Sequence, residues 1–115
     1  MSAGMNYSQR DIVLVPFPYS DLTGAKQRPA LILSNGKLNR TEDRLCCLIT
    51  SVRPMEGIAL DKNSFEEGSL PFQSWVKPFR VFTIHERIIR KRLCTINKKF
   101  YEKVLSALLE YIETE

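Results

Sequence analysis

Apolar residues in this sequence are gathered in short runs, each about the length of a β-strand. The clearest is L-C-C-L-I-T-S-V at residues 45–52, and others lie at residues 12–17, 29–34 (P-A-L-I-L-S), 57–60 and 75–84. Such runs, rich in β-branched and aromatic residues and separated by turn-forming segments, are typical of buried strands. The last run contains Pro78, which predicts a break or bulge in that strand.

A helical pattern is expected near the end of the sequence. Asn97 is a suitable N-cap, and the apolar residues that follow it recur at spacings of three and four, namely Tyr101, Leu105, Leu108, Leu109 and Ile112. This face is expected to pack on the sheet. Short strands, long turns and one C-terminal helix predict a mainly β fold, a small, mostly antiparallel barrel covered by the helix.

The composition fits one ordinary globular domain. The chain has 115 residues, of which 43% are hydrophobic and 26% are charged, so a single core is expected over residues 10–115 after a flexible leader at residues 1–9. No apolar run approaches the roughly 20 residues of a membrane span, and the leader lacks the apolar stretch of a signal peptide. We therefore expect a cytoplasmic protein without a membrane partner.

Few side chains suited to a metal occur. The sequence has one histidine and three cysteines, without a C-x-x-C spacing, so no metal site is expected. Cys46 and Cys47 are adjacent and would point to opposite faces of a strand, which argues against a bond between them. We expect all three cysteines to be reduced thiols.

Basic residues are concentrated in one part of the chain. Between residues 77 and 99 the only acidic residue is Glu86, whereas the basic ones are Lys77, Arg80, Arg87, Arg90, Lys91, Arg92, Lys98 and Lys99. Such a segment can bind a polyanion, since each contact of a lysine or arginine with a phosphate releases counterions. The alternative is a solvated basic edge that keeps the sheet from pairing with another one.

Arg28 is the first candidate for chemistry. It comes directly before Pro29, which biases it towards an extended backbone and is expected to open a strand, with the arginine at its mouth. Its planar guanidinium can hold a phosphate through two hydrogen bonds, although it could also pair with a carboxylate such as Asp21. Thr50 and Ser51 follow a buried strand and can either donate to an anionic oxygen or cap a turn.

Aromatic and basic residues alternate in the strand region that contains Pro78. Phe72, Trp75 and Phe79 lie around Lys77 and Arg80, a mixture suited to stacking unpaired bases while the cations follow the phosphates. In a strand, Trp75, Lys77 and Phe79 would share one side. The alternative is that the aromatic residues belong to the core or to a subunit interface.

Several of these segments together are similar to one known family. Residues 10–34, with R-P-A-L-I-L, the segment L-I-T-S at 48–51, and V-F-T-I with the basic segment and closing helix resemble the MazF/PemK toxin endoribonucleases. The resemblance implies an SH3-like barrel that forms a homodimer and is neutralised by a cognate antitoxin. It also implies cutting of single-stranded RNA at short sequences, without a metal or other cofactor.

The same resemblance assigns roles to residues. It implies that Arg28 and Thr50, with Ser51 beside them, hold the scissile phosphate while the ribose 2′-OH attacks it, which leaves a 2′,3′-cyclic phosphate and a 5′-OH. Since arginine has a pKa above about 12, electrostatic stabilisation is its first role and proton donation its second. The expected RNA-binding residues are Lys26, Trp75, Lys77, Arg80 and His85.

One departure from the family pattern leaves alternatives open. Some members carry a basic residue and then an acid two positions on, before the T-I motif, whereas this sequence has Lys77 and Phe79. The carboxylate is thus missing, and His85 is the alternative general base because it titrates near neutrality. Two other functions share this kind of fold: a CcdB-like poison of DNA gyrase, which does not need Arg28 and Thr50, and an inactive nucleic-acid-binding module.

Overall fold

The computed structural model describes residues 7–17 and 26–115, and in these residues one curled sheet carries most of the chain. Its strands are β1 (Asp11–Phe17), β2 (Lys26–Ile32), β3 (Asp43–Thr50), β4 (Ile58–Leu60), β5 (Phe65–Glu67), β6 (Ser74–His85) and β7 (Lys91–Ile96). The helices are α1 (Gly36–Asn39), the short 3-10 helix η3 (Glu86–Ile88) and α2 (Lys98–Ile112). None of these helices is long and apolar enough to cross a membrane.

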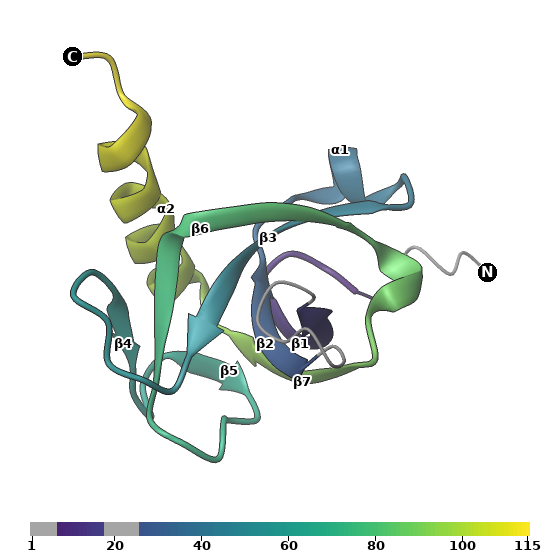
Figure 1. Cartoon of the computed structure of the whole chain (residues 1–115), viewed down its shortest axis with the longest axis horizontal. Helices are drawn as coiled ribbons and strands as arrows, with labels where there is room; N and C mark the ends of the chain where they lie inside the picture. Colours follow the sequence, from purple (N-terminus) through teal and green to yellow (C-terminus); the bar gives the residue numbers. More distant parts are fainter. Residues whose placement is uncertain (1–6, 18–25) are drawn as a thin grey trace.

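The strands lie in the order β4-β6-β3-β2-β1-β7-β5, and every neighbouring pair is antiparallel. Figure 1 shows how β6 arches over the top while β1, β2 and β7 curl beneath it, with α2 standing at one side. Within the described residues, the edge strands β4 and β5 are not paired with each other, so the barrel is only partly closed. The expected mainly β fold with a C-terminal helix is confirmed.

Alternation along the strands separates two apolar clusters, because successive side chains point to opposite faces. The first cluster joins the sheet to α2 and includes Ile12, Leu31, Ile49, Val76, Ile96, Phe100, Tyr101 and Val104. The second lies on the other face, inside the curl, and contains Val13, Val15, Ala30, Ile32, Cys46 and Ile89. Along β2, β3 and the first part of β6, side chains that alternate with those of the first cluster therefore point to the side of the second cluster.

The start of β2 differs from the prediction. The strand begins at Lys26, so Arg28 lies within it, opposite Val15, and Pro29 does not open it. The reason is the pairing of Pro29 with Leu14, whose carbonyl accepts from the backbone N–H of Arg90 on the other side. The backbone groups of Leu14 therefore point away from β2, and Leu14 and Pro29 exchange no hydrogen bond. Because proline only lacks an N–H, its presence at this position removes no hydrogen bond from the β1–β2 ladder.

Two strands were not expected from the sequence. The basic stretch continues into β7, and Glu66 and Glu67 lie in the short strand β5. The predicted bulge near Pro78 is confirmed, since Leu48 pairs with Lys77 whereas the preceding Cys47 pairs with Val81.

Helix α2 begins after Asn97, whose side chain accepts from the N–H of Phe100 as predicted. Its buried residues are Phe100, Tyr101 and Val104, with Leu105 and Leu108 partly buried beside them. Leu109 and Ile112 were expected on the packed face, but both are exposed. In Figure 1 the last turns of the helix project beyond the sheet, which explains this exposure.

The predicted leader at residues 1–9 is described only from Tyr7 onward. There, the side-chain amide of Gln9 donates to the carbonyl of Leu33 at 2.9 Å and to the hydroxyl of Tyr101 at 3.0 Å. Residues 7–9 are therefore attached to the domain. Residues 1–6 of the leader lie outside the described residues, as does Asp21, the alternative partner of Arg28.

Candidate functional site

Three neighbouring strands carry most of the predicted site residues on one face. In the β3–β6 ladder, Thr50 pairs with Trp75 and Leu48 pairs with Lys77. Ile49 and Val76, which alternate with them, belong to the cluster under α2. Since paired residues point to the same side of a sheet, Thr50, Trp75 and Lys77 share the opposite face, where each is half-buried.

Arg28 joins this face from β2. The β2–β3 ladder pairs Ala30 with Leu48, and the same register continued by two residues sets Arg28 opposite Thr50. Arg28 also alternates in phase with Ala30 and Ile32, which belong to the cluster inside the curl. The half-buried Arg28, Thr50 and Trp75 thus form a row across β2, β3 and β6, which we call the β2–β3–β6 row.

The hydroxyl of Thr50 is held by the turn that follows β3. Its Oγ1 accepts from the backbone N–H of Val52 at 3.1 Å. Its contact with the carbonyl of Val52 is long, at 3.4 Å, so the hydroxyl proton is only weakly engaged. Thr50 therefore caps a turn, and its hydroxyl can still donate a hydrogen bond to an anionic oxygen.

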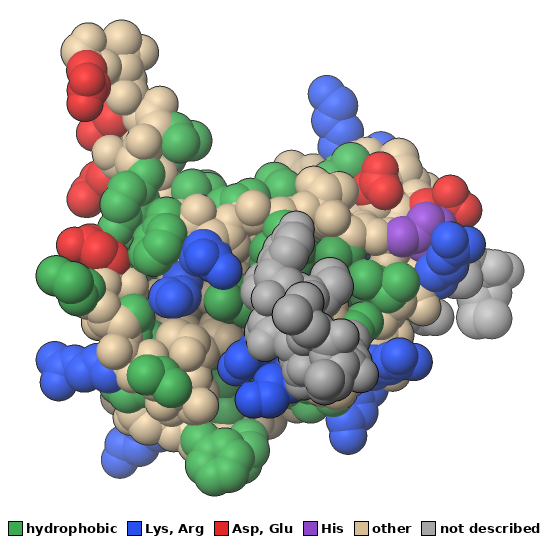
Figure 2. Space-filling view, viewed as in Figure 1, with side chains coloured by type: hydrophobic (Ala, Val, Ile, Leu, Met, Phe, Trp, Pro, Cys, Tyr) green, Lys and Arg blue, Asp and Glu red, His purple; other side chains and the backbone are tan. Residues whose placement is uncertain are grey.

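Among the described residues, no acid forms an ion pair with the cations near this row. In the described part of the chain, the ion pairs involve Arg10, Arg44, His85 and Arg92, and none involves Lys26, Arg28, Lys77 or Arg80. The Nζ atom of Lys77 lies 6.0 Å from the centre of the Phe79 ring, at the limit of a cation–π contact. Figure 2 shows Lys and Arg side chains over the region where β3 passes beneath β6.

His85 is not brought to this row. It pairs with Asp43 at the start of β3, whereas Thr50 ends that strand. Its Nδ1 accepts from the N–H of Arg87 and caps η3, and its Nε2 lies 3.5 Å from Oε1 of Glu42. Within one chain, His85 is therefore placed as a capping residue far from Arg28.

The basic stretch at residues 77–99 does not form one patch, because it folds into several elements. Arg92 lies 3.4 Å from Glu67 and 3.9 Å from Asp11, and is thus partly neutralised. Lys98 and Lys99 begin α2 at another place in the fold. Of this stretch, only Lys77 and Arg80 lie on β6 with the row.

Lys91 was named from the sequence only as one of the basic residues at 77–99, and it was not predicted to lie near Arg28. Lys91 lies on β7, where it pairs with Leu14 of β1. Together with Arg28 and Ser51, it lines a cavity of about 390 Å³. The rest of the lining is largely apolar and comprises Leu14, Pro29, Ile49, Leu70, Pro71, Phe72 and Leu93, with Gln27 and Ser74. We call this space the Arg28 cavity. Only the unpredicted strand β7 brings Lys91 to it.

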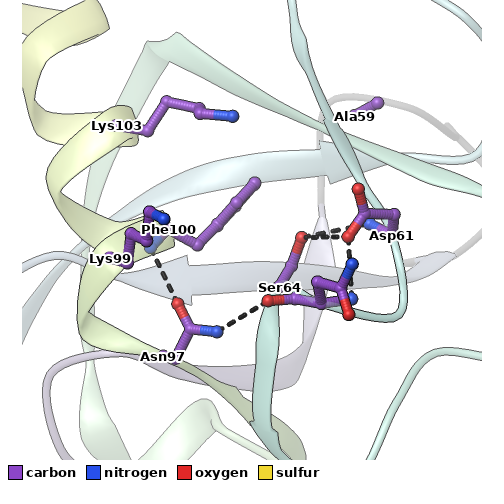
Figure 3. A pocket seen from close by; sticks show the side chains of 8 residues that line it. Ala59, Asp61, Ser64, Asn97, Lys99, Phe100 and Lys103 are labelled. Carbon is purple, nitrogen blue, oxygen red and sulfur yellow. Dashed lines mark hydrogen bonds between the residues drawn. The ribbon is translucent and has the colours of Figure 1, made fainter.

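A separate hollow lies at the start of α2 and is lined by Asp61, Ser64, Lys99 and Lys103, among others (Figure 3). Its polar groups bond to one another: the hydroxyl of Ser64 donates to Asp61 at 3.3 Å, and the amide of Asn97 donates to the carbonyl of Asn63 at 2.8 Å. These bonds fix the turn before β5 to the helix, which gives the hollow a structural role.

The other titratable groups do not form a second reactive centre. All three cysteines are free and buried. Burial raises the pKa of Cys46 to about 12 and that of Cys94 to about 11, and it also raises the pKa of Cys47. In the described ranges, no three side chains of His, Cys, Asp or Glu are arranged to hold a metal ion.

Comparison of the sequence with protein families gives one match that covers most of the chain. The model of the PemK-like, MazF-like toxin of type II toxin-antitoxin systems matches residues 8–112. The search of curated proteins gives no match.

Comparison with solved structures gives several similar chains. An endoribonuclease in complex with its cognate antitoxin, from a mycobacterial species, is 20% identical with a TM-score of 0.73, over 90% of this chain and 92% of that one. The MazE–MazF structure (Form-II) from Deinococcus radiodurans is 19% identical with a TM-score of 0.72, over 95% and 97%. The Mycobacterium tuberculosis toxin MazF-mt6 is 16% identical with a TM-score of 0.70, over 88% and 94%. At these identities the likeness establishes the fold.

Proposed function

Because this chain belongs to the family of PemK-like, MazF-like toxins of type II toxin-antitoxin systems, we propose that it is an endoribonuclease that cuts single-stranded RNA. The observation that carries the proposal is the β2–β3–β6 row, in which a half-buried arginine, a threonine hydroxyl and an indole follow one another across three strands. One of the structurally similar chains is itself an endoribonuclease, which supports the same activity here.

The chemistry follows from what Arg28 and Thr50 can offer a phosphodiester. The 2′-oxygen attacks phosphorus, the bond to the 5′-oxygen breaks, and the products are a 2′,3′-cyclic phosphate and a 5′-OH. The proton of the 2′-OH is lost and the leaving 5′-oxygen gains one. The Arg28 guanidinium stabilises the charge that grows on the phosphoryl oxygens, and the hydroxyls of Thr50 and Ser51 add hydrogen bonds. This charge stabilisation comes from the protein, so we propose that cutting does not need a metal.

RNA on either side of the cut would contact the residues that flank the row. Lys26 precedes Arg28 on β2, and Lys77 and Arg80 lie on β6, so their charges can follow the phosphates while the indole of Trp75 stacks on a base. His85 stays in this proposal as an RNA contact beyond the row, at the other end of β6.

The antitoxin is proposed to bind the same cations. A disordered acidic segment that folds on binding would be attracted to Arg28, Lys77 and Arg80, none of which has an acidic partner in the described residues. An acidic peptide should therefore compete with RNA for the protein. A peptide that binds without displacing RNA would contradict this proposal.

A homodimer is proposed on the exposed apolar residues of β6 and the end of α2, which we call the β6–α2 patch: Phe79, Val81, Leu109, Tyr111 and Ile112. The rings of Phe79 and Tyr111 are 5.6 Å apart. Figure 2 shows hydrophobic side chains along α2 down to its junction with β6. Contiguous exposed apolar surface of this kind marks an interface.

The proposed dimer is tested by light scattering. The wild type should be a dimer and Val81→Glu a monomer; a dimer that survives this change would place the interface elsewhere.

The proposed activity is tested with a long RNA of mixed sequence in excess EDTA. The wild type should cut it at a recurring short motif and leave cyclic-phosphate and 5′-OH ends, whereas Arg28→Ala should not cut. Arg40→Ala removes an exposed arginine at the C-cap of α1 and should cut as the wild type does. Failure of a folded wild type to cut would overturn the proposal and favour a toxin that acts through a protein interface.

A further inference from the structure

We propose that Tyr111, near the end of α2, is a positioning residue for the ribonuclease site, on which it acts by holding Glu56 in the segment between β3 and β4. We call this segment, residues 51–57, the β3–β4 loop. The inference rests on the proposed function, because a positioning role has meaning only if the chain cuts RNA. It adds to the β2–β3–β6 row a residue from the C-terminal helix.

The β3–β4 loop begins and returns next to the row. β3 ends at Thr50, which pairs with Trp75, and on the other side of β6 the same tryptophan pairs with Ala59 of β4. Since β6 lies between β3 and β4 in the sheet, the loop crosses the chain near the start of β6. A Cβ atom placed on Gly57 would lie 3.3 Å from the carbonyl oxygen of Val76, so the end of the loop is close to that strand. A shift of the loop therefore moves atoms beside the row.

The first residues of the loop orient the threonine hydroxyl of the row. The backbone N–H of Val52 donates to Oγ1 of Thr50 at 3.1 Å, which restricts the directions in which this hydroxyl can donate. Apolar packing contributes little to the position of the loop, because Val52 is 73% exposed and Met55 is fully exposed. A segment with so few buried apolar contacts depends on its polar contacts to stay in one place.

Tyr111 supplies such a contact towards the end of the loop. Its hydroxyl donates to Oε1 of Glu56 at 2.7 Å, a length typical of a strong hydrogen bond to a carboxylate. This bond raises the pKa of Tyr111, so the hydroxyl keeps its proton at neutral pH. The ring of Tyr111 lies 5.6 Å from that of Phe79 on β6. The tyrosine is thus placed against the sheet and attaches the loop to α2.

The contact between Tyr111 and Glu56 is better suited to positioning than to stabilising the fold. Both side chains are exposed, and hydrogen bonds between exposed groups add little to the free energy of unfolding. A small displacement of a group that contacts the reacting phosphate, in contrast, lowers the rate strongly. Loss of this contact should therefore leave the fold intact and slow the chemical step.

The first test measures single-turnover cutting of a short RNA that contains one mapped cleavage motif. Tyr111→Phe, which keeps the ring beside Phe79, and Glu56→Ala should each lower the rate constant roughly tenfold at full amplitude. The double variant should be no slower than either one. Glu56→Gln loses the same charge but keeps an oxygen acceptor, so it should stay near the wild type. Glu110→Ala removes the neighbouring exposed carboxylate of α2 and is the matched control.

A Thr50→Val background tests whether Tyr111 acts through the threonine. Without the hydroxyl that the loop orients, Tyr111→Phe should cause no further loss of rate. A merely structural role would lower the amplitude and leave the rate constant unchanged, because only the folded fraction would change. Light scattering and the thermal transition of each variant, at the assay concentration, control for assembly and folding.

The second test observes the loop without using activity. The three native cysteines are buried, so Met55→Cys gives one accessible thiol on the loop for a nitroxide label. The electron paramagnetic resonance lines of this label should become narrower when Tyr111→Phe or Glu56→Ala is added, because the loop then moves faster. Glu56→Gln should leave the spectrum as it is.

The outcomes separate this inference from the proposed function. If the wild type does not cut RNA, the proposed function fails and this role of Tyr111 fails with it. If the wild type cuts, but Tyr111→Phe and Glu56→Ala keep its rate constant, Tyr111 is not a positioning residue and the ribonuclease stands. A loss of amplitude alone, an unchanged spectrum of the label, or an equal loss of rate in the Thr50→Val background would each overturn the inference as well.

Discussion

Burial in the sheet decides the chemistry of the three cysteine thiols. Cys46 and Cys47 are neighbours on β3 whose side chains point to opposite faces of the sheet, Cys46 into the second apolar cluster and Cys47 into the first. Cys94 lies on β7 and belongs to the first cluster. Because burial disfavours the thiolate, the pKa of each thiol lies well above its ordinary value of 9.0. At pH 8 the native protein should react negligibly with a thiol reagent such as DTNB, and all three thiols should react after denaturation. Rapid reaction of a native thiol would contradict the burial described here.

The raised pKa values also predict how stability depends on pH. Well below the ordinary thiol pKa of 9.0, which applies to the unfolded chain, these thiols are protonated in both the folded and the unfolded chain, so they add no pH dependence. Between that value and about pH 11, only the unfolded chain loses their protons, and the free energy of unfolding should fall as pH rises. Urea unfolding in reducing buffer at pH 8 and pH 10 measures this, and the triple Cys→Ala variant should show a weaker decrease.

At the scale of elements, the start of α2 is a point where one side chain stabilises two segments. Asn97 accepts from the N–H of Phe100 and donates to the carbonyl of Asn63, both at 2.8 Å, as seen in part in Figure 3. Asn97→Ala should lower the free energy of unfolding by about 1–2 kcal/mol, as loss of an N-cap does. Asn63→Ala removes an exposed amide and keeps the carbonyl, so it should cost less than about 0.5 kcal/mol. Equal effects in urea unfolding at one protein concentration would refute this role.

The elements also show how far the sequence alone leads. Apolar runs and turn residues were enough to predict β1, β3, β6 with its bulge, and the helix after Asn97, because these follow local patterns. Strand β7 was not predicted because it begins with two charged residues, Lys91 and Arg92, and only its last residues are buried. The sequence therefore shows no apolar run over its whole length. Strand β5 has three residues and exists only through its pairing with β7.

Part of the candidate site could also be predicted, because it is carried by local sequence motifs. Arg28 and Thr50 were found through motifs, and the ladder register then sets them in one row with Trp75. The Arg28 cavity depends on contacts between distant segments: Lys91 reaches it through β7, and Phe72 through the segment after β5. No local pattern encodes such contacts.

At the scale of the whole molecule, the distribution of charge predicts how RNA binding responds to salt. The chain has a net charge of +4, and the candidate phosphate contacts are Lys26, Arg28, Lys77 and Arg80. If all four contact phosphates, the logarithm of the binding constant should fall with the logarithm of salt concentration with a slope of roughly −3. Lys77→Gln should reduce the magnitude of this slope by about 0.7, whereas Lys37→Gln, on exposed α1, should not. Equal slopes for both variants would remove Lys77 from the RNA surface.

The measurement that bears most directly on the β2–β3–β6 row is the single-turnover rate of RNA cutting by variants of Arg28 and Thr50. Arg28→Ala and Thr50→Val should each lower the rate by about 10²–10³, and the double variant should lose less than the product of the two, since both groups act on one phosphate. Thr50→Ser should retain most of the rate, and Thr83→Val, an exposed threonine of β6, should retain all of it. Full activity of folded Arg28→Ala, or independent effects of the two changes, would contradict the account.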